Sequence, residues 1–231
     1  MAALLPDSLT PEQVANALGI DRISVSPAVG RDDASVWVLS PRPIRIGRLS
    51  IVPAHFDAAP HAVRLIDTPA FGTGLHPTTA LCLQMLDEIV HTAPPVAVLD
   101  VGTGSGVLAL SALVLDVPRA LGIDIEDEAL RAAAGNARLN GLDDRLQLLR
   151  GGPETIAGTW PLVLANVLAS PLIEMAPTLV RRVGHHGQLV LSGIPASVEP
   201  DVARAYRRLG MRRVDVKLRA GWVALALQAS W

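Results

Sequence analysis

The residues best suited to bind a ligand lie in a glycine-rich segment, residues 98–106, where an apolar strand runs into a turn. Gly102, Gly104 and Gly106 carry no side chain that would keep a ligand from the backbone, and glycine readily takes the positive φ angles of a tight turn. A helix expected directly after the turn adds free N–H groups at its N-terminus. The segment predicts a site for the polar part of a nucleotide-like ligand, with Thr103 among the contacts, although an ordinary packing turn would use the same glycines.

Asp124 is the second candidate, because it ends the short apolar strand expected over residues 120–124 and lies 20 residues after Gly104. In doubly wound sheets an acid at this place accepts hydrogen bonds from both ribose hydroxyls of a bound cofactor. Asp124 could instead cap the next helix, as Asp127 also could. The spacing G-x-G-x-G lacks the third glycine of the dinucleotide pattern, which favours a single nucleoside with a small zwitterionic tail over NAD. S-adenosylmethionine fits that description.

Two further segments place polar groups where the same ligand would lie. Residues 70–79, with the sequence AFGTGLHPTT, form a polar loop whose hydroxyl and N–H groups could hold a carboxylate or close over a cofactor. Its candidate cofactor contacts are Phe71, Gly72 and Thr73. Asn166 ends an apolar run, and strand ends of this kind face the ligand in doubly wound folds. Helix caps at Thr78 and at Asn166 would explain the same residues without a ligand.

Alternating strands and helices position these candidates. Helices are expected over residues 79–90, 106–115, 127–139, 171–183 and 199–209, and strands over residues 96–101, 120–124, 146–149, 161–166, 187–192, 211–219 and 222–228. This alternation predicts an α/β fold with a doubly wound, mostly parallel seven-stranded sheet covered by helices on both faces. The short link at Ala220 and Gly221 makes the last two strands an antiparallel hairpin at the sheet edge.

The first part of the chain has a different pattern. A helix is expected to begin at Thr10 and to stop at Gly19, and proline-separated strands are expected over residues 35–39, 44–52 and 63–66. We therefore expect a small β-rich N-terminal region over residues 1–66, as a candidate substrate-docking element. The α/β domain would then take up residues 67–231.

Composition narrows the class of protein. With 231 residues, 50% of them hydrophobic, and a net charge of −2, the chain can bury one sizeable α/β core. The near-neutral charge and the 3% of aromatic residues disfavour direct binding of nucleic acid, and a solvated helix face explains the arginines between residues 204 and 213. Cys82 is the one cysteine, so we expect a buried thiol and no cysteine-rich metal site. Without a membrane-spanning stretch, a cytoplasmic monomer is expected.

Taken in order, six segments resemble the bacterial methyltransferases of ribosomal protein L11, over roughly residues 51–228. The segments are residues 70–79, 100–106, 122–125, 136–140, 165–168 and 191–194. The resemblance implies a Rossmann-like class I methyltransferase that moves a methyl group from S-adenosylmethionine to lysine side-chain and N-terminal amines of a ribosomal protein. It also implies that Thr79, Gly102, Asp124 and Asn166 contact the cofactor. Asn166 and Thr79 are then the candidate catalytic residues, because they would border the acceptor amine.

The N-terminal part departs from that family. Members of the family have a separate N-terminal domain that binds the ribosomal protein. Here fewer than about 60 residues precede the similar region, which predicts a reduced docking element. The related lysine methyltransferases of the electron-transfer flavoprotein β subunit also have a reduced lead-in and are the nearest alternative. A small-molecule or RNA methyltransferase of the same fold is a further one.

Methyl transfer from a sulfonium is an in-line displacement, so the protein must chiefly align the reactants and exclude water. A lysine amine has an ordinary pKa near ~10.4 and must become neutral, which desolvation favours. The amide oxygen of Asn166 could accept an N–H and so orient the amine. Residues 167–169 lack the two prolines and the aromatic residue typical of enzymes that methylate planar nitrogens, which favours an aliphatic amine. His76 is a candidate base, with a structural role as the alternative.

Overall fold

The computed structural model describes residues 2–4, 23–27, 35–39, 43–57, 59–66 and 76–231. Contacts divide the chain into two compact units, Met1–Arg42 and Pro43–Trp231. The first unit contains a three-stranded antiparallel sheet with the strand order β1-β3-β2. These strands are β1 (Ala2–Leu4), β2 (Ile23–Pro27) and β3 (Ser35–Leu39). The strand expected over residues 35–39 is confirmed, and the helix expected to begin at Thr10 lies outside the described residues.

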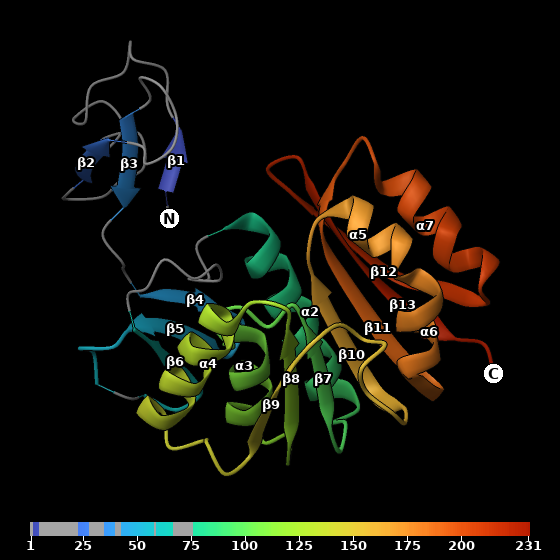
Figure 1. Cartoon of the computed structure of the whole chain (residues 1–231), viewed down its shortest axis with the longest axis horizontal. Coiled ribbons are helices and arrows are strands. Elements are labelled where there is room, and N and C mark those ends of the chain that lie inside the picture. Colours follow the sequence, from blue (N-terminus) through green and yellow to red (C-terminus); the bar gives the residue numbers. More distant parts are fainter. Residues whose placement is uncertain (1, 5–22, 28–34, 40–42, 58, 67–75) are drawn as a thin grey trace. The chain divides into compact units, whose positions relative to one another are not determined.

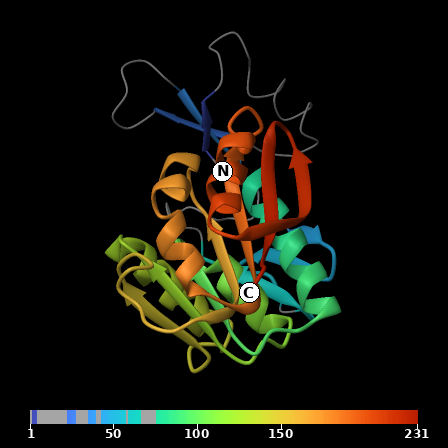
Figure 2. The same ribbon diagram turned by 90° about the vertical axis from the view of Figure 1, so that its right-hand side faces the viewer.

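The second unit is built on a seven-stranded sheet with the order β12-β13-β11-β10-β7-β8-β9 (Figure 1). Its strands are β7 (Val98–Val101), β8 (Ala120–Asp124), β9 (Leu146–Arg150), β10 (Trp160–Asn166), β11 (Val183–Pro195), β12 (Met211–Arg219) and β13 (Trp222–Ala229). In the sheet, β11, β10, β7, β8 and β9 lie side by side, and each is parallel to the next. Strand β13 runs antiparallel to both β11 and β12. The mostly parallel sheet and the hairpin at its edge are confirmed (Figure 2).

Helices cover both faces of this sheet (Figure 1). They are α2 (Pro77–Thr92), α3 (Val107–Val114), α4 (Asp127–Leu139), α5 (Ala169–Glu174), α6 (Ala176–Arg182) and α7 (Glu199–Arg208). Strand β10 is apolar up to Asn166 at its end because both of its faces are buried. Leu162 and Leu164 belong to the core formed with α2 and α3, whereas Val163 and Ala165 belong to the core formed with α5, α6 and α7. A strand buried on both faces has no polar side to alternate with.

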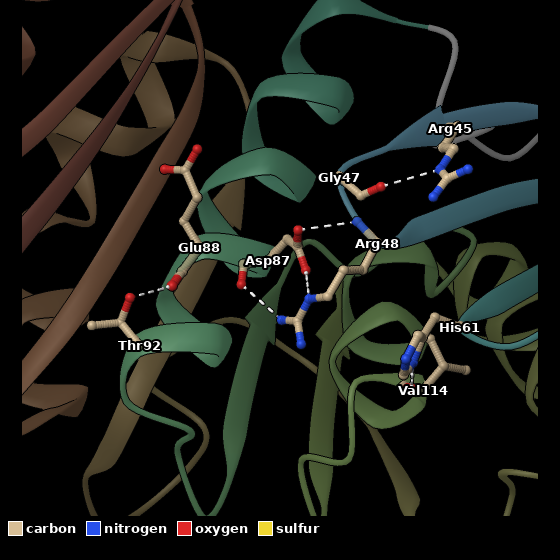
Figure 3. A network of polar contacts seen from close by, with 8 residues as sticks. All are labelled: Arg45, Gly47, Arg48, His61, Asp87, Glu88, Thr92 and Val114. Carbon is tan, nitrogen blue, oxygen red and sulfur yellow. Dashed lines mark hydrogen bonds and ion pairs between the residues drawn. The ribbon is translucent and has the colours of Figure 1, made fainter.

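A second small sheet packs against the α2 side of the unit. It consists of β4 (Ile44–Ile46), β5 (Leu49–Pro53) and β6 (Ala62–Leu65). The single strand expected over residues 44–52 is wrong, because the chain turns back at Gly47, whose φ is +58°. A Cβ atom there would lie 2.1 Å from Asp87 Oδ2, so the turn requires glycine. The same Asp87 carboxylate accepts hydrogen bonds from the Arg48 side chain at 2.7 Å and from the Arg48 backbone N–H at 3.2 Å, which fixes the turn to α2 (Figure 3).

The helix expected over residues 171–183 is wrong, because two short helices, α5 and α6, meet at Met175 in its place. Pro177 lies in the first turn of α6. Proline has no N–H to donate, and its ring clashes with the carbonyl group four residues earlier, so one continuous helix cannot pass through this position. Strand β11 also begins at Val183, earlier than the strand expected from residue 187. No helix in the described ranges is both long and apolar enough to cross a membrane.

Candidate active site

The carboxyl ends of β7, β8 and β10 border one cavity of about 600 Å³. After β7 the chain crosses to β8 and β9 on one side, and after β9 it returns to β10 on the other side of β7. Such a reversal of strand order is where doubly wound folds bind ligands. The cavity is lined by Val101, Gly102, Gly104, Asp124, Ile125, Glu126, Glu128, Ala129, Gly151, Gly152, Pro153, Asn166, Val167, Leu168, Pro171 and Met175. The structure thus places Gly102, Gly104, Asp124 and Asn166, all predicted site residues, around one space.

The turn after β7 takes the backbone conformation that its glycines predict. The φ angles of Gly102, Gly104 and Gly106 are +69°, +55° and +80°. A Cβ atom at Gly102 would lie 2.5 Å from Val167 Cγ1, so no side chain fits between this turn and the end of β10. The backbone of Gly102 therefore packs directly against the side chain of Val167, where these two chain segments border the cavity.

Asp124 uses both oxygens of its carboxylate to bind backbone N–H groups, one in the glycine turn and one just before α4. Its Oδ2 accepts a hydrogen bond from the Gly104 N–H at 2.9 Å, and its Oδ1 accepts one from the Glu126 N–H at 3.1 Å. Asp124 thus lines the cavity, but the interpretation of Asp124 or Asp127 as the cap of α4 is wrong. Glu126 is the N-cap, without a side-chain bond, and Asp127 is the first residue of the helix. An ionised carboxylate has about four acceptor positions, so two remain for a ligand.

Asn166 lines the cavity and contacts Thr79, which is fully buried and is not among the described residues that line the cavity. The Asn166 Nδ2 donates a hydrogen bond to the Thr79 Oγ1 at 3.3 Å, although the two residues are 87 positions apart. The Asn166 Oδ1 is buried and has no hydrogen-bond partner within the described part of the chain. Since burying an acceptor without a partner costs free energy, this oxygen is suited to a donor supplied by a ligand or substrate.

Ser192 fixes the start of α2 beside that pair. It lies within β11, paired with Asn166 of β10, it is fully buried, and its hydroxyl donates a hydrogen bond to the Thr78 carbonyl at 2.9 Å. The sequence interpretation gave Ser192 no role. The signal was present, because Ser192 is a polar residue that ends an apolar run, as Asn166 is.

His76 has the structural role that was kept as its alternative. It is the N-cap of α2, where its Nδ1 accepts from the Thr78 N–H at 3.4 Å and lies 2.8 Å from the Thr78 Oγ1. Its ring also packs edge to face against Trp222, with ring centroids 5.2 Å apart. Burial lowers the pKa of His76, so the neutral ring that a cap requires is favoured. The helix cap expected at Thr78 is therefore at His76.

Thr103 turns its side chain inward, toward Asp100 at the end of β7. The Thr103 hydroxyl donates to the Asp100 Oδ2 at 2.7 Å, and the Ala109 N–H donates to the same oxygen at 3.2 Å. Burial raises the pKa of Asp100 to about 6, against the lowering effect of these two donors, and the nearby Asp124 charge raises it further. The role of Thr103 as a cofactor contact stays a prediction. Phe71, Gly72 and Thr73 lie outside the described residues.

The charges around the cavity are acidic. Asp124, Glu126 and Glu128 line it, and none of the described residues that line it is basic. Phosphate groups would be repelled by these carboxylates, whereas a cation would be attracted to them. Ile125, Leu168 and Met175 add apolar surface, so the cavity suits a ligand with a flat apolar part, hydroxyl groups and positive charge.

Comparison with known proteins gives one consistent family. The family model described as "Ribosomal protein L11 methyltransferase (PrmA)" matches residues 12–230. The curated ribosomal protein L11 methyltransferase of Pelobacter propionicus is 38% identical over 216 residues, which cover 90% of this chain and 70% of that protein. The one from Chromohalobacter salexigens is 43% identical over 205 residues (86% and 67%), and that of Actinobacillus pleuropneumoniae serotype 5b is 44% identical over 174 residues (74% and 59%).

Solved structures agree with this assignment. The crystal structure of a ribosomal protein L11 methylase from Lactobacillus delbrueckii subsp. bulgaricus matches with a TM-score of 0.75 and 31% identity, covering 82% of this chain and all of that one. A methyltransferase from Pyrococcus furiosus, at 17% identity and a TM-score of 0.54, covers 66% of this chain and 85% of that one and shares the fold alone. The chain belongs to the ribosomal protein L11 methyltransferase family.

Proposed function

We propose that this protein transfers methyl groups from S-adenosylmethionine to lysine side-chain and N-terminal amines of ribosomal protein L11. The observation that carries the proposal is the Asn166 amide, whose nitrogen is held by Thr79 and whose buried oxygen has no partner among the described residues. That oxygen belongs to a residue lining an acidic cavity at the reversal of strand order. Membership of the family supports the same activity.

The residues present fit S-adenosylmethionine. Asp124 would accept hydrogen bonds from the ribose hydroxyls, and the glycine turn at Gly102 and Gly104 would lie against the methionine part. The acidic lining, with no basic residue among its described members, suits a sulfonium cation better than a dinucleotide. When bound, this cofactor supplies an electrophilic methyl group.

Asn166 then orients the acceptor. Because Thr79 occupies the amide nitrogen, the Oδ1 of Asn166 is the atom left to accept an N–H from the incoming amine, which directs the nitrogen lone pair away from Asn166. Desolvation would lower the pKa of the amine, against the raising effect of the acidic residues that line the cavity. The neutral, nucleophilic amine would then form by loss of a proton to solvent. We assign no general base, since His76 is engaged in capping α2.

Ribosomal protein L11 is favoured over the electron-transfer flavoprotein β subunit, because the family model and the curated relatives reported above carry its name. The acidic cavity disfavours RNA as the acceptor. We expect the protein to act in the cytoplasm, as a monomer and without direct contact to nucleic acid.

A labelling experiment tests the substrate. The purified protein is incubated with S-adenosylmethionine labelled in its methyl group and a lysate of a bacterium that lacks its own L11 methyltransferase. We expect label in a band that mass spectrometry identifies as ribosomal protein L11. Label confined to RNA or to small metabolites would refute the proposal, and label in a flavoprotein β subunit would replace the substrate while keeping the chemistry.

A further inference from the structure

Asn136 of α4 joins the segment after β6 to the glycine turn that borders the candidate active site. It is fully buried. Its Oδ1 accepts a hydrogen bond from the Ile66 N–H at 2.8 Å, directly after β6, and its Nδ2 donates one to the Ser105 carbonyl of the glycine turn at 2.8 Å. A single side chain thus uses both ends of its amide to link the small sheet to the turn that lines the cavity.

Helix α4 comes close enough to the turn to make this contact. A Cβ atom at Gly106 would lie 3.1 Å from the Ala133 Cβ, so the helix backbone packs almost directly on the turn. Asn136 follows Ala133 by three residues and lies on the same side of the helix. The turn is consequently held from two directions, by Asp124 at the Gly104 N–H and by Asn136 at the Ser105 carbonyl.

Asn140, one helical turn further, provides an internal comparison. Its Oδ1 accepts from the Arg64 N–H at 2.9 Å, and its Nδ2 donates to the Arg64 carbonyl at 2.8 Å and to the Asn136 carbonyl at 2.7 Å. Both asparagines therefore fix α4 to the β6 segment. Of this pair, within the described part of the chain, Asn136 is the one that bonds to the glycine turn.

We propose that Asn136 is a positioning residue for cofactor binding, which holds the Ser105 carbonyl and with it the conformation of residues 102–106. Asn140, by contrast, bonds to β6 and to the end of α4, and none of its side-chain bonds within the described residues reaches the turn. The inference rests on the proposed function, because it takes S-adenosylmethionine as the ligand of the turn. It goes beyond that function by assigning a task to a residue that does not line the cavity.

Paired variants separate positioning from anchoring. Asn136→Ala removes a fully buried asparagine of α4, and Asn140→Ala removes a half-buried asparagine at the C-cap of that helix. Each side chain bonds to the backbone of residues 64–66, so both variants should lower the melting temperature. Only Asn136→Ala should weaken binding of S-adenosylmethionine, measured by calorimetry, by about tenfold or more, which corresponds to about 1.4 kcal/mol. Asn140→Ala should keep the dissociation constant within about twofold of the wild type.

Each other outcome overturns the assignment. Equal losses of affinity in the two variants would mean that anchoring of β6 accounts for the effect, and unchanged affinity in Asn136→Ala would mean that the turn holds its conformation without this residue. If the wild type bound no S-adenosylmethionine, both the proposed function and this inference would fail. If the wild type bound it and Asn136→Ala bound it equally well, only the inference would fail.

A measurement on the wild type keeps the test decisive should Asn136→Ala not fold. The Ile66 N–H donates to Asn136, whereas the Arg64 N–H donates to Asn140. If Asn136 couples the turn to β6, saturating S-adenosylmethionine should slow hydrogen exchange of the Ile66 amide more than that of the Arg64 amide. Equal slowing of both amides, or no slowing of either, would refute the coupling.

Discussion

Asp124 holds the backbone on both sides of the end of β8 and also lines the candidate cavity. It binds the Gly104 and Glu126 N–H groups, so it shapes the cavity wall before contributing any contact of its own. The acid was predictable from its place at a strand end, 20 residues after Gly104. Its bonds to backbone were not, because they depend on how closely the turn and the start of α4 approach it in three dimensions.

Replacing Asp124 should therefore reduce cofactor binding strongly. Asp124→Ala removes a charge-assisted acceptor worth about 1.5–3 kcal/mol for each hydrogen bond, so the dissociation constant for S-adenosylmethionine should rise more than about tenfold by calorimetry. Glu128→Ala, which removes an exposed acid from the same lining, is the control and should change it by less than about threefold. Similar small effects in both variants would show that Asp124 does not contact the ribose.

Asp100 makes stability depend on pH. Because burial raises its pKa to about 6, from 3.8, the folded protein holds this proton more tightly than the unfolded chain. The contribution of Asp100 to the free energy of unfolding therefore falls as pH rises from about 4 to about 6. Above about pH 6 the buried carboxylate is ionised, and the whole of this contribution is lost. Asp100→Asn, which cannot ionise, should gain up to about 3 kcal/mol relative to the wild type across it, by urea unfolding. A difference between the two proteins that is constant with pH would contradict this.

At the scale of elements, β7, β8 and β10 were predictable because strands buried on both faces are mostly apolar, here except for Asp100 within β7 and the polar residues Asp124 and Asn166 that end β8 and β10. The errors have local causes. The turn at Gly47 lies between apolar residues that look like one strand, and its glycine is required by Asp87, which is distant in the sequence. The break before Pro177 could have been recognised from the proline itself. The hydrogen bond from Ser192 to the Thr78 carbonyl joins residues 114 positions apart, which periodicity does not report.

The junction between the small sheet and α2 should depend on Arg48. Its side chain donates to the Asp87 carboxylate at 2.7 Å and to the Asp87 carbonyl at 3.0 Å (Figure 3). Arg48→Ala should lower the free energy of unfolding by about 1–2 kcal/mol, since it leaves a largely buried carboxylate with fewer donors. Arg45→Ala, which loses only a 3.4 Å contact with the Gly47 carbonyl, should change it by less than about 0.5 kcal/mol. Equal losses by urea unfolding would show that this ion pair contributes nothing specific.

At the scale of the whole molecule, the chain has two compact units, and the described residues that line the candidate cavity belong to Pro43–Trp231. The chain spans 70%, 67% and 59% of the length of the three curated relatives reported above. The assignment of residues 1–66 to substrate docking and of residues 67–231 to catalysis stays a prediction. By contacts, residues 43–66 group with the large sheet.

Removing residues 1–42 should separate docking from cofactor binding. Because the cavity belongs to the second unit, the shortened protein should bind S-adenosylmethionine within about twofold of the full chain, whereas the KM for ribosomal protein L11 should rise by about tenfold or more. Calorimetry and initial rates measure the two quantities. An unchanged KM would show that the first unit takes no part in docking, and a loss of cofactor affinity would show that it supports the site.

The central claim is that Asn166 orients an amine of ribosomal protein L11 for methylation. The most direct test is mass spectrometry of purified, unmethylated ribosomal protein L11 after incubation with S-adenosylmethionine and either the wild type or Asn166→Ala. We predict that the wild type adds methyl groups to lysine side chains or the N-terminus. Asn166→Ala should lower kcat by about 100-fold while keeping the cofactor dissociation constant within about threefold. No methylation by the wild type, or an equal rate with Asn166→Ala, would contradict the account.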